Sequence, residues 1–514
     1  MGAAGGRRAP GRRGAGAPGA PGAPRAPGAR GPAGPAGPAG DSPLGGRALE
    51  GSGGGRARGR GRGGGVRARG GAGGGQEPEP GPPEPTVSWE EAWDELWDEP
   101  PAPPADAAPE RMWSNVNPET LEHEPGSVAG ATALVAGTAV GAGILALPTV
   151  TQPAGFEASA VALGGAWAYS VVTGLLIAEV NLNTMCDLGS GGASLISMAR
   201  RTLGDLGAGA AGLTYVFLHY ALLVAYISRA GELVGGEALG GPAGTVFTAA
   251  LGAACYFSGP RRLDQLNSAL VGGVLLTFAG LLAACAGGLD FGELGRADWG
   301  ELPDALPVIA LAFVYQNVVP VVSSSLEGDA AKIRTAIVAG TAVPLAMFLL
   351  WDAAILGGPG GATGAGDPLA ALQAGGGVLS ALVPAFSLLA IATSFIGFTL
   401  GLSDFLADAL GEPSGPPRPL PYALTLGPPA VCALLAKDIF VKALDLAGTF
   451  GVLVLFGALP AAMVWAERYG PAAGTGLYPL RFLPGGKPAL AAVGALAAAV
   501  VLREAAQDLL AALP

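Results

Sequence analysis

Apolar segments long enough to cross a membrane recur along the chain after residue 125. A helix needs about 20 mostly apolar residues to span the roughly 30 Å hydrocarbon core of a bilayer. The pattern predicts eleven such helices, here called spans 1 to 11, at approximately residues 127–150, 156–181, 210–234, 241–258, 266–288, 303–325, 334–357, 378–402, 419–436, 443–465 and 488–502. We therefore predict an all-α membrane protein whose transmembrane domain covers residues 126–514.

Composition and missing motifs argue against a soluble enzyme. Of the 514 residues 50% are hydrophobic and 13% are charged, and the mean hydropathy is +0.44. The chain has two histidines and lacks the GxSxG, HExxH and CxxC patterns that mark nucleophilic and metal-dependent sites. We expect no enzyme activity, no catalytic residue and no metal site.

Lysine and arginine are distributed unevenly between the predicted loops. The positive-inside rule places the loops richer in these residues on the cytoplasmic side, or on the equivalent side of an organelle. With the N-terminus on that side, it receives the ten residues Arg200, Arg201, Arg261, Arg262, Lys332, Arg334, Arg418, Arg468, Arg481 and Lys487. The opposite side receives only four, which are Arg296, Lys437, Lys442 and Arg503. An error in the number of spans would exchange the sides of the later loops and remove this asymmetry, so the asymmetry supports the predicted number. We call the side with more lysine and arginine the basic-loop side.

Two segments of different composition precede the spans. Residues 1–75 contain thirteen arginines, no lysine and two acidic residues among Gly, Ala and Pro, so they should remain disordered. Their composition is typical of an organellar transit peptide, but it also resembles nucleic-acid-binding segments or reflects composition bias alone. Residues 76–125 form an acidic linker, in which Trp89, Trp93 and Trp97 favour either a short amphipathic helix or a solvated segment.

Span 1 contains the stretch GTAVGAGILALP at residues 137–148. Glycines four residues apart permit close packing of membrane helices. The alternative is a break in the helix, because glycine costs about 1 kcal/mol relative to alanine within a helix. Unwound backbone in a membrane is tolerated where it lines a cavity, and its free N–H and C=O groups can bind the carboxylate and ammonium of a zwitterion. From these residues alone, both interpretations stay open.

Five motifs in order resemble the hydroxy and aromatic amino acid permease family, which contains the tyrosine and tryptophan permeases. They are GTAVGAGILALP (137–148), LLIAEVN (175–181), LAFVYQNVVP (311–320), GTAVPL (340–345) and ATSFIG (392–397). The resemblance implies a five-plus-five inverted repeat of the amino acid–polyamine–organocation type, with helices 1 and 6 broken near the midplane. Pro303, Pro307 and Pro320 in span 6 agree with a break there.

The resemblance also implies a substrate site between the two breaks. The residues it implicates are Gly137, Thr138, Gly141 and Gly143 of span 1, around the substrate carboxylate, and Phe313, Tyr315, Gln316 and Asn317 of span 6, as the facing wall. Two aromatic and two amide side chains suit an aromatic amino acid with a polar tip. Phe313 and Tyr315 are two residues apart, so they share one face only where the backbone is unwound.

Candidates for ion coupling are fewer. Thr393 and Ser394 in span 8 could complete a sodium site with carbonyls of span 1, although such hydroxyls as often bond their own helix. Ionisable residues within spans are functional candidates by default, and they are Glu179, His219, Arg229, Glu232 and Asp352. Of these we favour Glu179 as a proton relay, whereas His219 is at least as well explained as a satisfied interhelical donor.

We therefore expect a secondary active transporter that moves an aromatic amino acid, with L-tyrosine as the expected substrate, by alternating access coupled to H⁺ or Na⁺. No other cofactor and no nucleic-acid partner is expected. The alternatives are a permease for another neutral amino acid, such as tryptophan, serine or threonine, and a membrane protein whose Arg-rich tail binds nucleic acid.

Span 6 departs from the bacterial members of the family, which usually have a break containing Gly and His. Its sequence Tyr-Gln-Asn-Val-Val-Pro at residues 315–320 resembles the plant and algal branch instead. Together with the transit-like tail, this predicts a multi-pass protein of the plastid (chloroplast) inner envelope. The direction of flux and the oligomeric state stay open.

Overall fold

The residues that the structure describes form helices and contain no strand. The computed structural model describes residues 126–141, 143–188, 193–358, 366–411, 419–436, 439–470 and 481–512. The Arg-rich segment 1–75 and the acidic linker 76–125 lie outside these residues, so what the sequence predicts for them stays a prediction.

Eleven apolar helical elements can be identified in the described part of the chain, one for each predicted span. Nine helical segments are long and apolar enough to cross a membrane, a bent pair of helices forms a tenth, and one shorter apolar helix completes the series. The longer helices are α4 (Phe156–Leu188), α5 (Leu195–Phe257), α6 (Pro260–Cys285), α10 (Ala330–Leu356), α12 (Leu379–Leu410), the shorter α13 (Pro419–Leu435) and α16 (Gly486–Ala512). The short helices η1 (Ala286–Gly288), α7 (Phe291–Leu294) and α11 (Pro368–Ala374) lie beyond the ends of these helices.

The helix α5 contains both span 3 and span 4. They are separated at Gly236, whose φ of 63° lies in the left-handed region. Glycine adopts this conformation without the steric penalty that a Cβ would impose. The turn therefore depends on a glycine at this position.

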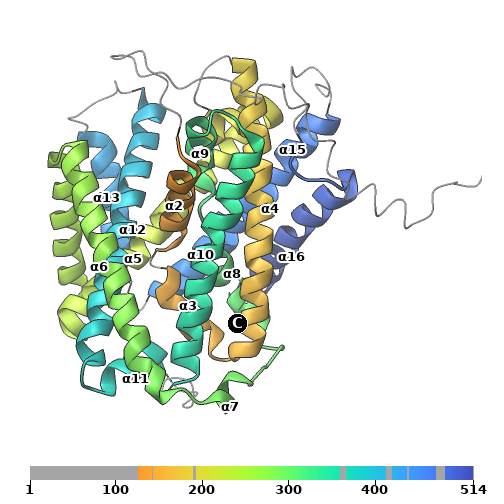
Figure 1. Ribbon diagram of the computed structural model, residues 1–514. Helices are drawn as coiled ribbons and strands as arrows, with labels where there is room; N and C mark the ends of the chain where they lie inside the picture. The colour runs from red at the N-terminus through yellow and green to blue at the C-terminus, as the bar shows by residue number, and fades with distance from the viewer. Residues whose placement is uncertain are drawn as a thin grey trace, which may run out of the picture. The chain divides into compact units, whose positions relative to one another are not determined.

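Spans 1 and 6 are broken, as the resemblance implied. Span 1 consists of α2 (Val128–Ala139) and α3 (Gly143–Thr151), which meet at an angle of 55°. Span 6 consists of α8 (Leu302–Ala312), the short turn η2 (Gln316–Val318) and α9 (Val319–Ser325). In Figure 1, α2 lies above α3 whereas α9 lies above α8, so the two broken spans run in opposite directions. Breaks five spans apart in antiparallel spans fit an inverted repeat.

Span 10 is irregular as well. The helices α14 (Phe440–Leu446) and α15 (Leu459–Tyr469) flank η3 (Ala447–Ala458), which is a π-helix. Gly448 brings η3 onto α8, because a Cβ added at this glycine would lie 2.2 Å from the carbonyl oxygen of Pro307. Small residues allow membrane helices to approach this closely.

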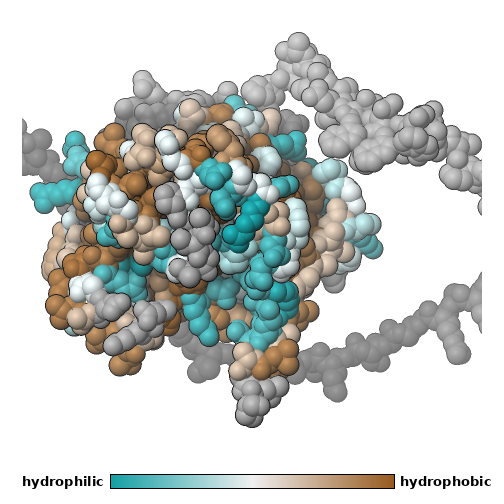
Figure 2. Space-filling model, turned by 90° about the horizontal axis from the view of Figure 1, so that it is seen from below, coloured by the Kyte–Doolittle hydropathy of each residue, from teal (hydrophilic) through white to brown (hydrophobic). Residues whose placement is uncertain are grey.

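Hydrogen bonds between loops show which ends of the spans lie together. At one end Arg296, which precedes span 6, donates to the carbonyl of Gln152, which follows span 1. At the other end the N–H of Gly126, before span 1, donates to the carbonyl of Ser325, at the end of span 6. Figure 2 shows the first of these ends, the one with α7 and α11, where hydrophilic residues gather in the middle and hydrophobic residues form much of the edge. An apolar edge suits a surface that faces lipid.

Candidate functional site: a cavity at the helix breaks

The break in span 1 removes backbone groups from the helical hydrogen-bond ladder. The N–H of Gly141 donates to the carbonyl of Ala139 (3.0 Å) instead of the carbonyl of Gly137, four residues back. The Gly137 carbonyl is thereby released from its helical donor. The helix α3 begins beyond the break, and its first N–H groups place a partial positive charge there. The predicted break in helix 1 is therefore confirmed.

Span 6 is unwound between α8 and η2. The N–H of Val314 donates to the carbonyl of Leu311 (3.2 Å), and the N–H of Tyr315 donates to Oε1 of Gln316 (3.0 Å). Neither is the i to i−4 bond of an α-helix. The Gln316 side chain therefore replaces a backbone acceptor and stabilises the open conformation.

The two breaks approach each other closely through glycines. A Cβ added at Gly143 would lie 3.3 Å from Cα of Ala312, where α8 ends. A Cβ added at Gly141 would lie 2.7 Å from Oγ of Ser394 in α12. The glycines of the GTAVGAGILALP stretch thus combine the two interpretations, since they allow both the break and the close packing of other helices against it.

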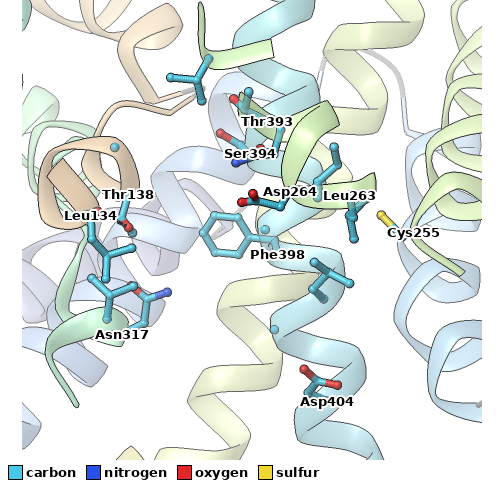
Figure 3. Close-up of a pocket in the computed structure, with 18 of the residues that line it drawn as sticks. Leu134, Thr138, Cys255, Leu263, Asp264, Asn317, Thr393, Ser394, Phe398 and Asp404 are labelled. Atoms are coloured by element: carbon cyan, nitrogen blue, oxygen red, sulfur yellow. Dashed lines mark hydrogen bonds between the residues drawn. The ribbon is translucent and has the colours of Figure 1, made fainter. Parts of the chain in front are cut away.

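A cavity of about 940 Å³ lies beside both breaks. Among the predicted substrate residues it is lined by Gly137, Thr138 and Asn317, and among the predicted coupling residues by Thr393 and Ser394. Figure 3 shows Thr138 and Asn317 on one side of the cavity and Thr393 and Ser394 across from them. Residues from spans 1, 6 and 8 are thus brought to one cavity.

The cavity extends toward the basic-loop side. Its lining includes Ser258, at the end of α5, and Asp404, in the C-terminal part of α12. Arg261 and Arg262 follow Ser258 along the chain. Among the described residues, the lining contains the carboxylates of Asp264 and Asp404 and no lysine or arginine. These charges favour a cation in the cavity.

Aromatic side chains close the opposite side of the breaks. Trp351 of α10 is fully buried and donates from Nε1 to the carbonyl of Ile144 in α3 (2.9 Å). Its ring packs against Phe386 of α12, and Phe313 packs against Phe348, with ring centroids 5.1 Å apart in both pairs. The breaks are therefore packed closed on this side, whereas the cavity extends toward the basic-loop side.

Three of the four span 6 residues predicted to bind the substrate do not line the cavity in this structure. Phe313 and Tyr315 are fully buried, and Gln316 is nearly so. The Tyr315 hydroxyl donates to the carbonyl of Ser170 (2.9 Å), and Nε2 of Gln316 donates to the hydroxyl of Thr173 (3.2 Å), both in α4. These side chains fasten the unwound part of span 6 to span 2.

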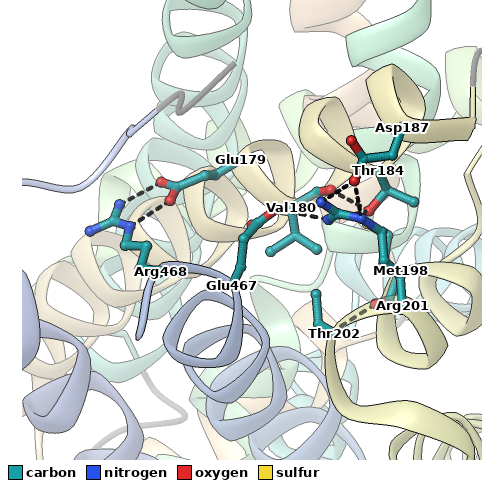
Figure 4. A network of polar contacts seen from close by, with 9 residues as sticks. All are labelled: Glu179, Val180, Thr184, Asp187, Met198, Arg201, Thr202, Glu467 and Arg468. Atoms are coloured by element: carbon teal, nitrogen blue, oxygen red, sulfur yellow. Dashed lines mark hydrogen bonds and ion pairs between the residues drawn. The ribbon is translucent and has the colours of Figure 1, made fainter. Parts of the chain in front are cut away.

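Glu179, the predicted proton relay, belongs to a polar network apart from the cavity (Figure 4). Its carboxylate accepts two hydrogen bonds from Arg468 (2.6 Å each) and a third from the N–H of Phe482 (2.8 Å). In the same network Arg201 pairs with Glu467 (2.7 Å). The charge-assisted bonds join spans 2, 3 and 10 at the basic-loop end.

Several cavity residues were not predicted as site residues from the sequence. Tyr215 and His219 of α5, Asp264 of α6 and Phe398 of α12 also line the cavity. Of these, only His219 stands out in the sequence, as an ionisable residue within a span. The spacing of four between Tyr215 and His219 places them on one helical face, but no local pattern shows what that face contacts.

Comparisons with known proteins agree with this geometry. The model of the tryptophan/tyrosine permease family matches residues 124–503. A tryptophan-specific transport protein of Pseudomonas aeruginosa (strain UCBPP-PA14) is 31% identical over 375 residues, which are 66% of this chain and 87% of that protein. The tyrosine-specific transport system 2 of Haemophilus influenzae (strain ATCC 51907 / DSM 11121 / KW20 / Rd) is 31% identical over 367 residues, with coverage of 66% and 87%. The family match runs from before span 1 into span 11, and the chain therefore belongs to the tryptophan/tyrosine permease family.

Proposed function

We propose that this protein is a secondary active transporter that carries aromatic amino acids through the cavity by alternating access, with L-tyrosine as its main substrate. The observation that carries the proposal is the meeting of two helix breaks at one cavity lined by Gly137, Thr138 and Asn317. Relatives named as tryptophan-specific and tyrosine-specific transport proteins support the aromatic class. The preference for tyrosine within the aromatic class is a more specific claim than the class itself.

The break in span 1 is the proposed site for the amino acid backbone. The N-terminal end of α3, which begins at Gly143, offers N–H groups to the carboxylate. The released carbonyl of Gly137 is an acceptor for the ammonium group. The Thr138 hydroxyl donates to the carbonyl of Leu134 (2.8 Å), so its lone pairs are also available to the ammonium.

Span 6 supplies the other wall in this proposal. Asn317 is exposed in the cavity, and its amide can both donate to the substrate and accept from it. Phe313, Tyr315 and Gln316 have a positioning role in this proposal. They fix the unwound backbone before Asn317 against α4 and α10. They contribute to the site without touching the substrate in the state described.

A coupling cation would bind between spans 1 and 8. The Ser394 hydroxyl lies against the break at Gly141, and Thr393 donates to the carbonyl of Ala390 (2.9 Å), which leaves its lone pairs free to coordinate Na⁺. The alternative coupling ion is H⁺, with Glu179 as the relay. Because Arg468 holds the Glu179 carboxylate here, that role requires the pair to separate in another state.

Uptake by proteoliposomes tests the proposal. We expect saturable uptake of radiolabelled tyrosine and tryptophan that rises when a pH or sodium gradient is imposed. Ser394→Ala would weaken the response to sodium if the cation lies beside span 8, and Glu179→Gln would weaken the response to pH if Glu179 relays protons. An uptake rate that neither a pH gradient nor a sodium gradient changes would identify a facilitator, which moves its substrate without ion coupling. If none of the aromatic amino acids is taken up, the proposed substrate class is refuted.

We further propose that the protein resides in the plastid inner envelope and that residues 1–75 are its transit peptide. The support is the sequence of this segment, which is rich in arginine and poor in acidic residues. Import of a reporter fused to residues 1–75 into isolated plastids tests this. A reporter that stays outside, or that binds RNA instead, would contradict it.

A further inference from the structure

We infer that His219 accepts a hydrogen bond from the ring tip of the substrate, so that the transporter prefers aromatic amino acids whose ring carries an N–H or O–H donor. Tyrosine and tryptophan have such a donor, whereas phenylalanine has none. This inference rests on the proposed function and names the group in the cavity that distinguishes among aromatic substrates.

The hydrogen bond at one ring nitrogen determines what the other can do. Nδ1 of His219 lies 2.8 Å from the carbonyl oxygen of Tyr215. A carbonyl can only accept, so Nδ1 carries the hydrogen of this bond. His219 is only 4% exposed, and burial of a charged ring without a partner is unfavourable. Nε2 is then a hydrogen-bond acceptor.

That acceptor lies at the cavity, where α5 packs closely against Gly401 of α12. A Cβ added at Gly401 of α12 would lie 3.5 Å from Nε2 of His219 and 3.3 Å from the hydroxyl of Tyr215. Tyr215, His219 and Gly401 all line the cavity. A ligand in the cavity that brings an N–H or O–H donor to Nε2 gains a hydrogen bond there, whereas a ligand without a donor does not.

Aromatic rings surround the same place. The rings of Tyr215 and His219 have centroids 4.0 Å apart, and His219 meets Phe398 edge-on at 5.0 Å. Figure 3 shows the Phe398 ring in the cavity, on the same helix as Ser394. Such a wall suits the flat face of a substrate ring. An aromatic side chain held here, with its backbone at the breaks, would point its tip at His219.

Two pairs of substrates that match in shape test the inference. Tyrosine and phenylalanine differ by the phenol O–H, and tryptophan and 3-benzothienylalanine differ by the replacement of the indole N–H with sulfur. For the wild-type protein in proteoliposomes we expect kcat/KM for the donor-bearing member of each pair to be higher by about tenfold or more. In His219→Leu we expect both ratios to fall towards one.

Two further variants separate the inference from a general effect on folding. His219→Gln keeps an acceptor oxygen and should retain part of the preference. Tyr220→Phe removes a hydroxyl from the same helix, but this hydroxyl donates to the carbonyl of Leu424 (2.8 Å) and does not line the cavity, so both ratios should be unchanged. Aromatic uptake with no donor preference in the wild type, or an intact preference in His219→Leu, would overturn the inference while leaving the proposed function standing. No aromatic uptake by the wild type would instead refute the proposed function, and the inference with it.

Discussion

Leucine in place of Gly141 will abolish uptake of tyrosine and tryptophan and leave the protein folded. Even the first carbon of the new side chain would lie 2.7 Å from the Ser394 hydroxyl, and the rest would extend into the break. The substitution therefore removes the space in which we place the substrate carboxylate and the coupling cation. Since both groups depend on the open backbone, we expect a loss of uptake by at least about 100-fold, measured as the initial rate in proteoliposomes.

Gly165→Leu is the matched control for this substitution. Gly165 lies on α4, it is exposed, and a Cβ added there meets no atom within 4 Å. The same change of residue type should therefore leave uptake within about twofold of the wild type, as expected for a surface position. Full uptake by Gly141→Leu would show that the glycine serves helix packing alone and that the substrate site lies elsewhere.

Replacing Arg468 by leucine will strongly destabilise the fold. The Arg468 and Glu179 side chains are 5% and 1% exposed, and their two hydrogen bonds are 2.6 Å long. Without the guanidinium, the buried carboxylate keeps, among the described residues, the N–H of Phe482 as its hydrogen-bond donor. Removal of one member of a buried pair costs about 3–5 kcal/mol. Thermal unfolding of the purified protein in detergent, followed by tryptophan fluorescence, measures the loss.

Two controls identify the cause of that loss. Glu179→Leu together with Arg468→Leu should be more stable than Arg468→Leu alone, because no uncompensated charge then remains. Arg503→Leu removes a partly exposed partner of Asp304, and exposed ion pairs contribute about 0–1 kcal/mol, so its melting temperature should change little. If the single and double variants at 179 and 468 unfold at the same temperature, the pair does not stabilise the fold in the way proposed.

The spans and the breaks could be predicted from sequence because both depend on local properties. Apolar length fixes where a helix can cross a membrane, and all eleven predicted spans have a counterpart among the described helices. Gly137 to Gly143 indicated a possible interruption of span 1, since the low helix propensity of glycine acts within a single turn. The same glycines also allowed close packing, and the family resemblance implied the break.

The orientation of side chains at the break in span 6 could not be predicted. Phe313, Tyr315, Gln316 and Asn317 follow one another in an unwound backbone, which has no fixed period to assign them to faces. Three of them turn into the protein, and only Asn317 lines the cavity. Their partners in α4, such as Ser170, are about 145 residues away in the chain, and only tertiary packing brings them together.

Residues that act through distant partners were equally hard to assign. Glu179 was conspicuous as an acid within a span, but its partner Arg468 lies 289 residues further along the chain and no pattern in either segment links them. The sequence marks His219 as an ionisable residue within a span, whereas its place in the cavity depends on the packing of α5 against α12. Residue type therefore identifies these candidate functional residues, but only the folded structure shows which side chains contact them.

Protection of a cysteine in the cavity by substrate tests the central claim most directly. Leu134 lines the cavity one turn before Thr138 and is 39% exposed. In a protein whose four native cysteines are replaced by alanine, Leu134→Cys is treated with a membrane-impermeant thiol reagent from either side. Phe257→Cys, at the 79% exposed end of α5 and outside the cavity lining, serves as the control.

We predict that Leu134→Cys reacts from the basic-loop side, and that saturating tyrosine or tryptophan slows the reaction by about tenfold or more, while glutamate and lysine do not. The control cysteine should react from the same side at a rate that no amino acid changes. A reaction rate at Leu134→Cys that aromatic amino acids leave unchanged, or labelling from the opposite side only, would contradict the claim that this cavity is the aromatic substrate site open to the basic-loop side.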